Sequence, residues 1–234
     1  MMSMESETQN SLDDKFERSV SLLAWAYNEE ELIGEFLDRA VALLESCVSE
    51  WEIVLVNDCS TDRTLEIVQN WMAREPRIRI VNHPRNLNVG WACRNAVKNA
   101  QNDIIFWQTV DWSYDLKNLR LFLELTKHYD VVQGIRPTPI RLFSYIPGLR
   151  SLYRVKSRSD NLWAAVVSLS NYYILRIFYG LNFHDFQNIT FYPRQFVQSL
   201  DLVCTSAFFN PEMLSKSHAT GASFIEVPIR FLPR

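Results

Sequence analysis

Glycine is scarce in this sequence, with six residues in 234. Neither a G-x-G-x-x-G run nor a G-x-x-x-x-G-K-[S/T] run occurs, so the glycine-rich loops that hold phosphates in dinucleotide-binding and P-loop proteins are absent. The four cysteines, at positions 47, 59, 93 and 204, lack a C-x-x-C spacing. With no signal peptide before them, they are expected to be reduced cytosolic thiols rather than a disulfide scaffold or a zinc site. The four histidines show no H-x-x-x-H spacing and are expected to be hydrogen-bonded core or surface residues.

Long hydrophobic runs are missing too. The most apolar stretch, Asn161–Phe183, is interrupted by Arg176, and its polar residues fall within about half of a helical wheel. This pattern predicts an amphipathic helix, packed on the sheet or lying in a membrane interface, and argues against a transmembrane span. The segment Met1–Arg18 is polar, acidic and aperiodic, which predicts a disordered leader before a single domain over residues 19–234.

Between residues 20 and 128, short apolar runs alternate with segments of helical period. The expected strand and helix pairs are Val20–Ala26 with Glu30–Ser46, Glu52–Val56 with Arg63–Arg74, Ile78–Val81 with Trp91–Ala100, and Asp103–Val110 with Lys117–His128. Such repeats predict βα units, and therefore an α/β domain with a mostly parallel sheet flanked by helices. A helix over Pro211–His218 and a strand over Phe224–Arg230 are expected later in the chain.

Polar residues follow several of the predicted strands. Asn28, before three glutamates, and the run Ser60–Asp62 are typical helix N-cap signals, which puts helix N-termini at the edge where α/β sheets bind ligands. After the fourth strand, Asp111, Ser113 and Asp115 alternate so that all three lie on one side of the chain. Carboxylates so placed are typical of a Mg²⁺ or Mn²⁺ site that also holds a diphosphate. The alternative is that these carboxylates are solvated or cap a helix.

Charge is unevenly distributed along the chain. Residues 1–62 carry 15 acidic and 3 basic side chains, whereas residues 63–234 carry 12 acidic and 21 basic ones. The densest cationic stretch, Val131–Ser159, contains no acidic residue and six basic ones: Arg136, Arg141, Arg150, Arg154, Lys156 and Arg158. Such a stretch suits phosphates or an anionic membrane surface, and the alternative is a solvated loop.

Several short motifs follow one another in a distinctive order. Trp25–Glu30 reads W-A-Y-N-E-E and Val56–Asp62 reads V-N-D-C-S-T-D. The further motif residues are Asn86, Gly90, Arg94-Asn95, Gly134–Arg136, Ser157 with Asn161, Asp185, Glu212, Glu226–Ile229 and Arg234. Over residues 20 to 234 this order resembles the family 2 glycosyltransferases of GT-A fold, and within them the dolichyl- or polyprenyl-phosphate sugar synthases.

The resemblance implies a nucleotide-binding part over about residues 19–115 and an acceptor part over about residues 116–234. The residues it implies for donor binding are Ala26, Tyr27, Glu29, Asn57, Asp58, Gly90 and Arg94. It implies Mg²⁺ or Mn²⁺ at Asp111, Ser113 and Asp115, and catalytic roles for Asp111, Asp115 and Arg136. The family has aspartate where this chain has Ser113, so we hypothesise that the second carboxylate has moved to Asp115.

The resemblance also implies an inverting transfer of a sugar from a nucleotide-diphosphate donor to a polyprenyl or dolichyl phosphate. Such an acceptor is already anionic and needs no general base, which agrees with the absence of the acidic pair and Q-x-x-R-W segment that serve alcohol acceptors in relatives. The alternatives are a non-catalytic nucleotide-sugar-binding or regulatory homologue, or a transferase with a non-lipid acceptor. A nucleotidyltransferase is disfavoured because Ala24–Glu31 contains no glycine- and lysine-rich loop.

For partners and location, we expect no nucleic acid, because the aromatic residues around Tyr172 lack a strand-based platform with interleaved basic side chains. We expect a cytoplasmic protein that can lie peripherally on the cytoplasmic face of a membrane, held by the cationic stretch and the amphipathic helix.

Overall fold

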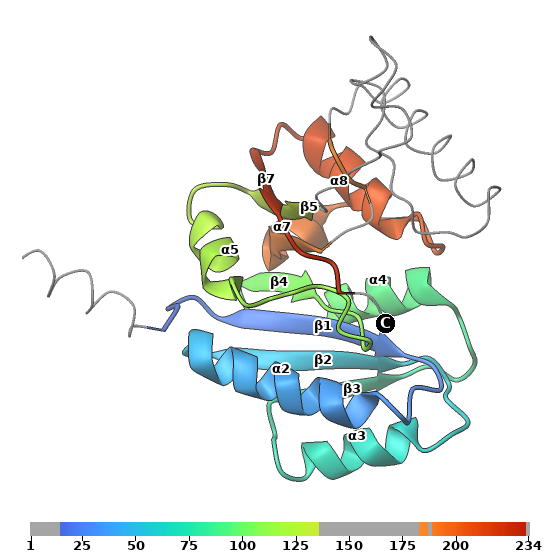
Figure 1. Cartoon of the computed structure of the whole chain (residues 1–234). Helices are drawn as coiled ribbons and strands as arrows, with labels where there is room; N and C mark the ends of the chain where they lie inside the picture. The colour runs from blue at the N-terminus through green and yellow to red at the C-terminus, as the bar shows by residue number, and fades with distance from the viewer. Residues whose placement is uncertain (1–14, 136–182, 187–188, 233–234) are drawn as a thin grey trace, which may run out of the picture.

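The computed structural model describes residues 15–135, 183–186 and 189–232. Its centre is a seven-stranded sheet with the strand order β3-β2-β1-β4-β6-β5-β7 (Figure 1). Six of these strands run in the same direction, and β6 runs antiparallel to both of its neighbours, β4 and β5. The predicted α/β domain with a mostly parallel sheet is confirmed.

The strands are β1 (Val20–Ala26), β2 (Trp51–Asn57), β3 (Ile78–Asn82), β4 (Ile104–Trp107), β5 (Val131–Ile135), β6 (Thr190–Pro193) and β7 (Phe224–Pro228). The helices are α2 (Ile33–Cys47), α3 (Thr64–Met72), α4 (Val89–Asn99), α5 (Leu119–Leu125), α7 (Arg194–Ser199) and α8 (Phe209–Ala219).

Two apolar cores lie on opposite faces of the sheet, because successive side chains of a strand point to opposite sides. In β1, Leu22 belongs to the core that also contains residues of α2, α3 and α5, whereas Leu23 belongs to the core under α4, α7 and α8. All seven residues of β2 are buried, as expected for a central parallel strand that is covered on both faces. Figure 1 shows α2 and α3 together on one face.

Three expectations need correction. Phe16 is buried and pairs with Val48 in an isolated bridge, so the chain is ordered before Arg18 and the predicted leader is too long at that end. The fourth strand ends at Trp107 rather than Val110, because the chain turns there: the side-chain amide of Gln108 donates to the carbonyl oxygen of Tyr114 (2.7 Å).

The third correction concerns Asn28, which does not cap α2. That helix begins at Ile33, and Asn28 has a positive φ of 54°. Its side-chain oxygen accepts the amide N–H of Thr61 instead (2.8 Å), so it joins two loops. In the part of the chain that the structure describes, no helix is long and apolar enough to cross a membrane. The segment Asn161–Phe183 lies outside the described residues except for its last residue, Phe183, which is buried in the core under α8.

Candidate functional site

A cleft of about 320 Å³ opens at the edge of the sheet where β1 and β2 end. Its walls come from the β1–α2 loop, the end of β2, the β3–α4 loop with the start of α4, and the loop after β4. The lining residues are Trp25, Ala26, Tyr27, Glu29, Asp58, Asn86, Asn88, Val89, Ala92, Thr109, Val110 and Asp111. This is the edge at which the sequence places a ligand.

The β1–α2 loop is fixed by hydrogen bonds to the loop that follows β2 and to the first residue of α3. The amide N–H of Asn28 donates to Ser60 Oγ (3.1 Å), and that of Glu29 donates to Thr64 Oγ1 (2.8 Å). Ala26, Tyr27 and Glu29, all predicted from the sequence, therefore stand on a rigid rim of the cleft. Tyr27 is 47% exposed and lines the cleft, so it is an aromatic residue accessible to a ligand there.

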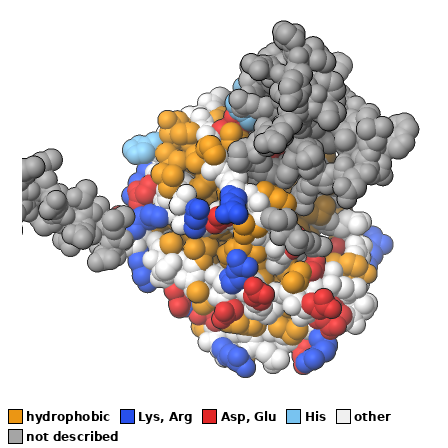
Figure 2. All heavy atoms as spheres, viewed as in Figure 1, with side chains coloured by type: hydrophobic (Ala, Val, Ile, Leu, Met, Phe, Trp, Pro, Cys, Tyr) orange, Lys and Arg blue, Asp and Glu red, His pale blue; other side chains and the backbone are white. Residues whose placement is uncertain are grey.

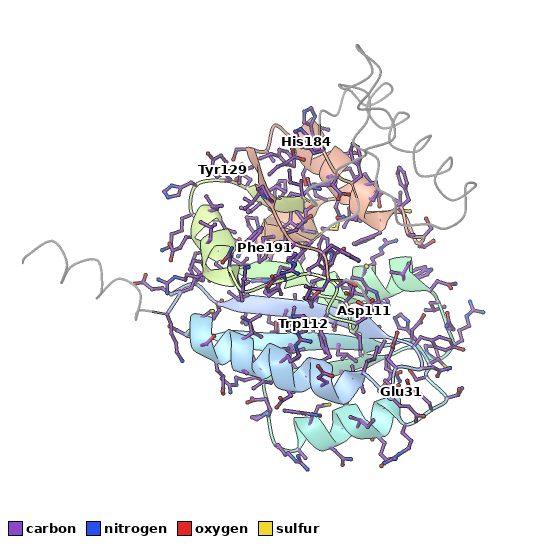
Figure 3. The ribbon with its side chains drawn as sticks, viewed as in Figure 1. Glu31, Asp111, Trp112, Tyr129, His184 and Phe191 are labelled. Atoms are coloured by element: carbon purple, nitrogen blue, oxygen red, sulfur yellow. The ribbon has the colours of Figure 1, made fainter. Side chains whose placement is uncertain are left out.

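Acidic residues gather around the same rim. Figure 2 shows them at the lower right of the face in view, and Figure 3 labels Glu31 there. This position is the start of α2 and α3, where negative charge is favourable because it faces the positive end of the helix dipole.

Asp58 lies in the cleft wall directly after β2 and is 5% exposed. Its Oδ1 accepts the amide N–H of Leu87 (2.8 Å) and lies 2.6 Å from Nδ1 of His83, while its Oδ2 accepts the amide N–H of Asn88 (2.9 Å). The carboxylate therefore orders the β3–α4 loop as well as facing the cleft.

Asn57, the residue before Asp58, does not line the cleft. Its side chain is buried, donates from Nδ2 to Asn82 Oδ1 (3.0 Å) and accepts the amide N–H of Ser60 at Oδ1 (3.1 Å). It therefore ties the ends of β2 and β3 together and supports the loop that carries Asp58, rather than reaching a ligand.

Asp111 lines the cleft from the loop after β4, and the hydroxyl of Ser113 donates to its Oδ1 (2.6 Å). Between them, Trp112 has a positive φ of 52°, an uncommon conformation for a bulky residue. Its ring packs edge-on against Phe36 (5.8 Å) and under the guanidinium of Arg39 (4.5 Å). Figure 3 shows Trp112 between the sheet and α2, with Asp111 farther toward the end of β1.

Asp115 is not among the residues that line the cleft. Its backbone N–H donates to the carbonyl oxygen of Arg230 (3.0 Å), and its Oδ1 accepts the amide N–H of Lys117 (3.2 Å). Within the described residues, no group of three His, Cys, Asp or Glu side chains is arranged to hold a metal ion. The structure thus gives no support to the relocation of a metal carboxylate to Asp115.

A divalent cation nevertheless fits the chemistry of this cleft. Glu29, Asp58 and Asp111 are its charged lining residues, and no lysine or arginine among the described residues lines it. A nucleotide diphosphate would meet like charge there unless a cation lay between. Mg²⁺ is commonly bound by one or two carboxylates together with substrate phosphates, so Asp111 meets the requirement for a single protein carboxylate.

Gly90, predicted as a donor-binding residue, instead packs against the backbone of Thr205 and Ser206, just before α8. A Cβ on Gly90 would lie 2.1 Å from the carbonyl carbon of Thr205, so the residue serves the close approach of α4 to the segment before α8. That segment is held by Glu212, which accepts the amide N–H groups of Val203 and Cys204 (both 2.9 Å).

The carboxylate of Glu212 is also a negative charge in a largely buried place. Burial alone would raise the pKa of Glu212, but hydrogen bonds from Lys216 Nζ (2.8 Å) and from the two backbone amides outweigh it and hold the pKa below its usual range. Glu212, one of the motif residues, is therefore an ionised anchor of the loop that packs on α4.

Arg94 is not brought to the cleft. Val89 and Ala92 lie on the face of α4 that borders the cleft, and Arg94, two residues beyond Ala92, points to another side of the helix. Its guanidinium donates to the carbonyl oxygen of Val203 (3.5 Å) and lies 5.5 Å from the centre of the Trp91 ring. Arg136 lies outside the described residues, as do Ser157, Asn161 and Arg234.

A second pocket of about 170 Å³ adjoins the cleft and shares Trp25, Val89 and Thr109 with it. Its remaining walls are mainly apolar and come from β1, β4, α4 and the start of α8. The sequence motifs did not single out Thr109, Val89, Ala92 or this pocket, because small and apolar residues carry no recognisable chemical signal until the fold brings them together.

The fold and the cleft define a GT-A-type α/β domain with an acidic ligand site at the carboxyl edge of its sheet. Residues 21–194 match the family Glycosyl transferase family 2, and the chain belongs to that family. The fold is shared with the mannosyltransferase PcManGT from Pyrobaculum calidifontis in complex with GDP-Man and Mn²⁺ (TM-score 0.59, 17% identity, 91% of this chain and 55% of that one). It is also shared with glucosyl-3-phosphoglycerate synthase from Mycobacterium tuberculosis in complex with Mn²⁺, UDP-Glc and phosphoglyceric acid (TM-score 0.62, 15% identity, 93% and 72%).

Curated relatives include enzymes named for polyprenyl phosphates. Dolichyl-phosphate beta-glucosyltransferase ALG5C of Trichomonas vaginalis is 40% identical over 91 residues, which is 37% of this chain and 27% of the relative. Dodecaprenyl-phosphate galacturonate synthase of Rhizobium johnstonii is 28% identical over 170 residues, 71% of this chain and 45% of the relative. The chain thus spans between about a quarter and a half of the length of these relatives.

Proposed function

We propose that this chain transfers a sugar, with inversion, from a nucleotide-diphosphate donor to a polyprenyl or dolichyl phosphate. The observation that carries the proposal is the acidic cleft, which is lined by the exposed Tyr27 and by Asp111. The names of the curated relatives support a polyprenyl phosphate acceptor, and the GDP-Man and UDP-Glc in the complexes of the structural neighbours support a nucleotide-sugar donor.

The donor would bind across the end of β1. The open face of Tyr27 suits stacking on the base, and the fixed loop around Glu29 suits the ribose. Among the described residues, those that line the cleft lie between positions 25 and 111, which supports a nucleotide-binding part over about residues 19–115. Asn57, Gly90 and Arg94 would support this part through packing and loop contacts.

Asp111 would be the protein ligand of Mg²⁺ or Mn²⁺. When bound, the cation would neutralise the charge that develops on the departing diphosphate. The Ser113 hydroxyl holds one oxygen of Asp111, which fixes the orientation of the carboxylate and makes Ser113 an orienting residue rather than a second charge. This arrangement would let the site hold a cation with serine at the position where the family motif has aspartate.

The reaction is a single displacement. An oxygen of the acceptor phosphate attacks the anomeric carbon on the face opposite the diphosphate, the new carbon–oxygen bond forms, and the bond to the diphosphate breaks with its electron pair. The attacking oxygen carries no proton at neutral pH, so the step requires no general base. The mainly apolar pocket beside the cleft suits the first part of a prenyl chain better than it suits a sugar acceptor.

The cationic stretch Val131–Ser159 would hold the acceptor phosphate and the membrane surface, a proposal that rests on its charge in the sequence alone because residues 136–159 lie outside those described. Neutralising Arg136, Arg154 and Arg158 together should weaken binding to anionic liposomes by roughly 1 kcal/mol per residue, and less at high salt. Unchanged liposome binding and unchanged use of a lipid phosphate would refute this part of the proposal.

The function is tested by incubating the protein with Mn²⁺, a panel of UDP- and GDP-sugars, and a short polyprenyl phosphate, with the matching unphosphorylated polyprenol as the acceptor control. We expect a glycolipid of inverted anomeric configuration with the phosphate only, and none with Asp111→Asn. Calorimetric donor binding without turnover would instead select the regulatory homologue. Transfer to a free sugar would select a non-lipid acceptor.

A further inference from the structure

His83 lies at the centre of a hydrogen-bonded chain behind the cleft. Its side chain is 3% exposed, and the residue follows β3 directly. Nδ1 lies 2.6 Å from Oδ1 of Asp58, and Nε2 lies 2.7 Å from Nδ2 of Asn95 in α4. The backbone of His83 is also fixed, because its N–H donates to the carbonyl oxygen of Asn57 (2.9 Å).

These contacts define which ring nitrogen donates to Asp58. Nε2 of His83 faces the side-chain amide nitrogen of Asn95, which can only donate, so Nε2 accepts and the ring N–H directed at Asp58 is the one on Nδ1. Nδ1 then donates to Asp58. A histidine held in this way fixes the rotation of its carboxylate partner, because the N–H to oxygen bond is short and directional.

The orientation of Asp58 matters for the shape of the cleft. Its two oxygens accept the amide N–H groups of Leu87 and Asn88, which belong to the loop between β3 and α4. Asn88 has a positive φ of 68°, a conformation that costs free energy unless the surroundings hold it. Asn86 and Asn88 of this loop line the cleft.

We propose that His83 is a positioning residue of the donor site: as the Nδ1-protonated imidazole it ties α4 to Asp58 and so holds the 86–88 loop in its ligand-binding shape. This inference rests on the proposed function, because it takes the cleft to be the donor site. It extends that proposal by a residue that makes no contact with the ligand.

Three substitutions separate the two bonds of the ring. His83→Leu removes both. His83→Asn keeps an N–H near the position of Nδ1 and so keeps the bond to Asp58, whereas His83→Gln keeps a polar group near Nε2 and only the bond to Asn95. His128, which is exposed, gives the matched control as His128→Leu.

Donor affinity is measured by calorimetry with UDP or GDP and Mn²⁺, whichever nucleotide the wild type binds. We expect His83→Leu and His83→Gln to lose affinity roughly tenfold, the loss typical of removing the partner that orients a ligand-binding group. His83→Asn should recover most of it, and His128→Leu should bind as the wild type does. The KM for the acceptor should not change in any variant.

Nuclear magnetic resonance tests the positioning without any ligand. The ¹⁵N signals of His83 should show a proton on Nδ1 and none on Nε2, and amide hydrogen exchange at Leu87 and Asn88 should accelerate in His83→Gln but not in His83→Asn. A ring protonated at Nε2, or equal donor affinity in the folded His83→Gln and His83→Asn variants, would overturn the inference. If the wild type binds no nucleotide, the proposed function fails, and the exchange measurement still decides whether His83 holds the loop.

Discussion

Gly90 offers the sharpest test of how α4 packs against the segment before α8. A Cβ built on Gly90 would lie 2.1 Å from the carbonyl carbon of Thr205 and 2.3 Å from the backbone nitrogen of Ser206. Carbon atoms in contact are normally about 3.5–4.0 Å apart, so the segment would have to move by more than about 1 Å. Backbone cannot rotate away as the end of a side chain can, and Glu212 holds the same segment in place.

The expected cost of Gly90→Ala follows from these contacts. Overpacking of a fitted site costs about 1–3 kcal/mol, and loss of a hydrogen bond to Glu212 adds about 1 kcal/mol. The better helix propensity of alanine returns at most about 1 kcal/mol. We therefore expect a net loss of about 2 kcal/mol in the free energy of unfolding, which for a domain of this size lowers Tm by about 4–8 °C.

Gly34 provides a matched control, because it is also the second residue of its helix. The nearest atom to a Cβ there is Cγ2 of Ile67 at 3.9 Å, an ordinary contact. Gly34→Ala should raise the free energy of unfolding by about 0.5–1 kcal/mol through helix propensity. Urea titration and calorimetry of both variants measure the difference. A Gly90→Ala protein as stable as Gly34→Ala would refute the close approach of α4 to residues 205–206.

Three further predictions concern the cleft and its supports. Asp111→Asn should abolish Mn²⁺-dependent donor binding and change Tm by no more than a surface substitution does. Asp115→Asn should bind the donor as the wild type does. The opposite result for the two variants would identify Asp115 as the metal ligand. The pKa of Glu212 is held below its usual range, so the stability that ionised Glu212 contributes is complete above the ordinary carboxyl pKa and is lost as the pH falls through the lowered pKa. The urea midpoint should therefore fall more between pH 6 and pH 3 in the wild type than in Glu212→Gln. An equal fall of the urea midpoint with pH in the two proteins would contradict an ionised Glu212. Trp112→Ala should lower the free energy of unfolding by about 3–5 kcal/mol through lost packing. Trp112→Gly should lower it by about 1 kcal/mol less, because glycine adopts the positive φ of this position without strain. An alanine variant more stable than the glycine variant would contradict that backbone conformation.

The sequence by itself determined the order of the elements from β1 to α5 and the edge of the sheet at which the cleft lies. A parallel strand covered on both faces has to be apolar along its whole length, and β2 is buried at all seven positions, so its apolar run is visible without coordinates. Parallel strands also end at a common edge, which is why Tyr27, Asp58 and Asp111, far apart in the chain, could be assigned to one cleft.

Only the tertiary structure decided which of the polar residues face that cleft. Spacing alone puts Asp111 and Asp115 on one side of an extended chain. In the structure the backbone at Trp112 has a positive φ, and the backbone N–H of Asp115 donates to the carbonyl oxygen of Arg230, so the two carboxylates have different surroundings. Gly90 shows the same limit, because a glycine that allows backbones to touch has the same sequence signal as a glycine that admits a phosphate.

His83 is the clearest case of what the fold adds. The sequence predicts a hydrogen-bonded histidine, and nothing in its spacing links it to Asp58, 25 positions away, or to Asn95 in another element. Local pattern reports the period and polarity of a segment, because these follow from the geometry of one strand or helix. The partner of a buried polar group is set by which segments pack together, and that is a property of the whole chain.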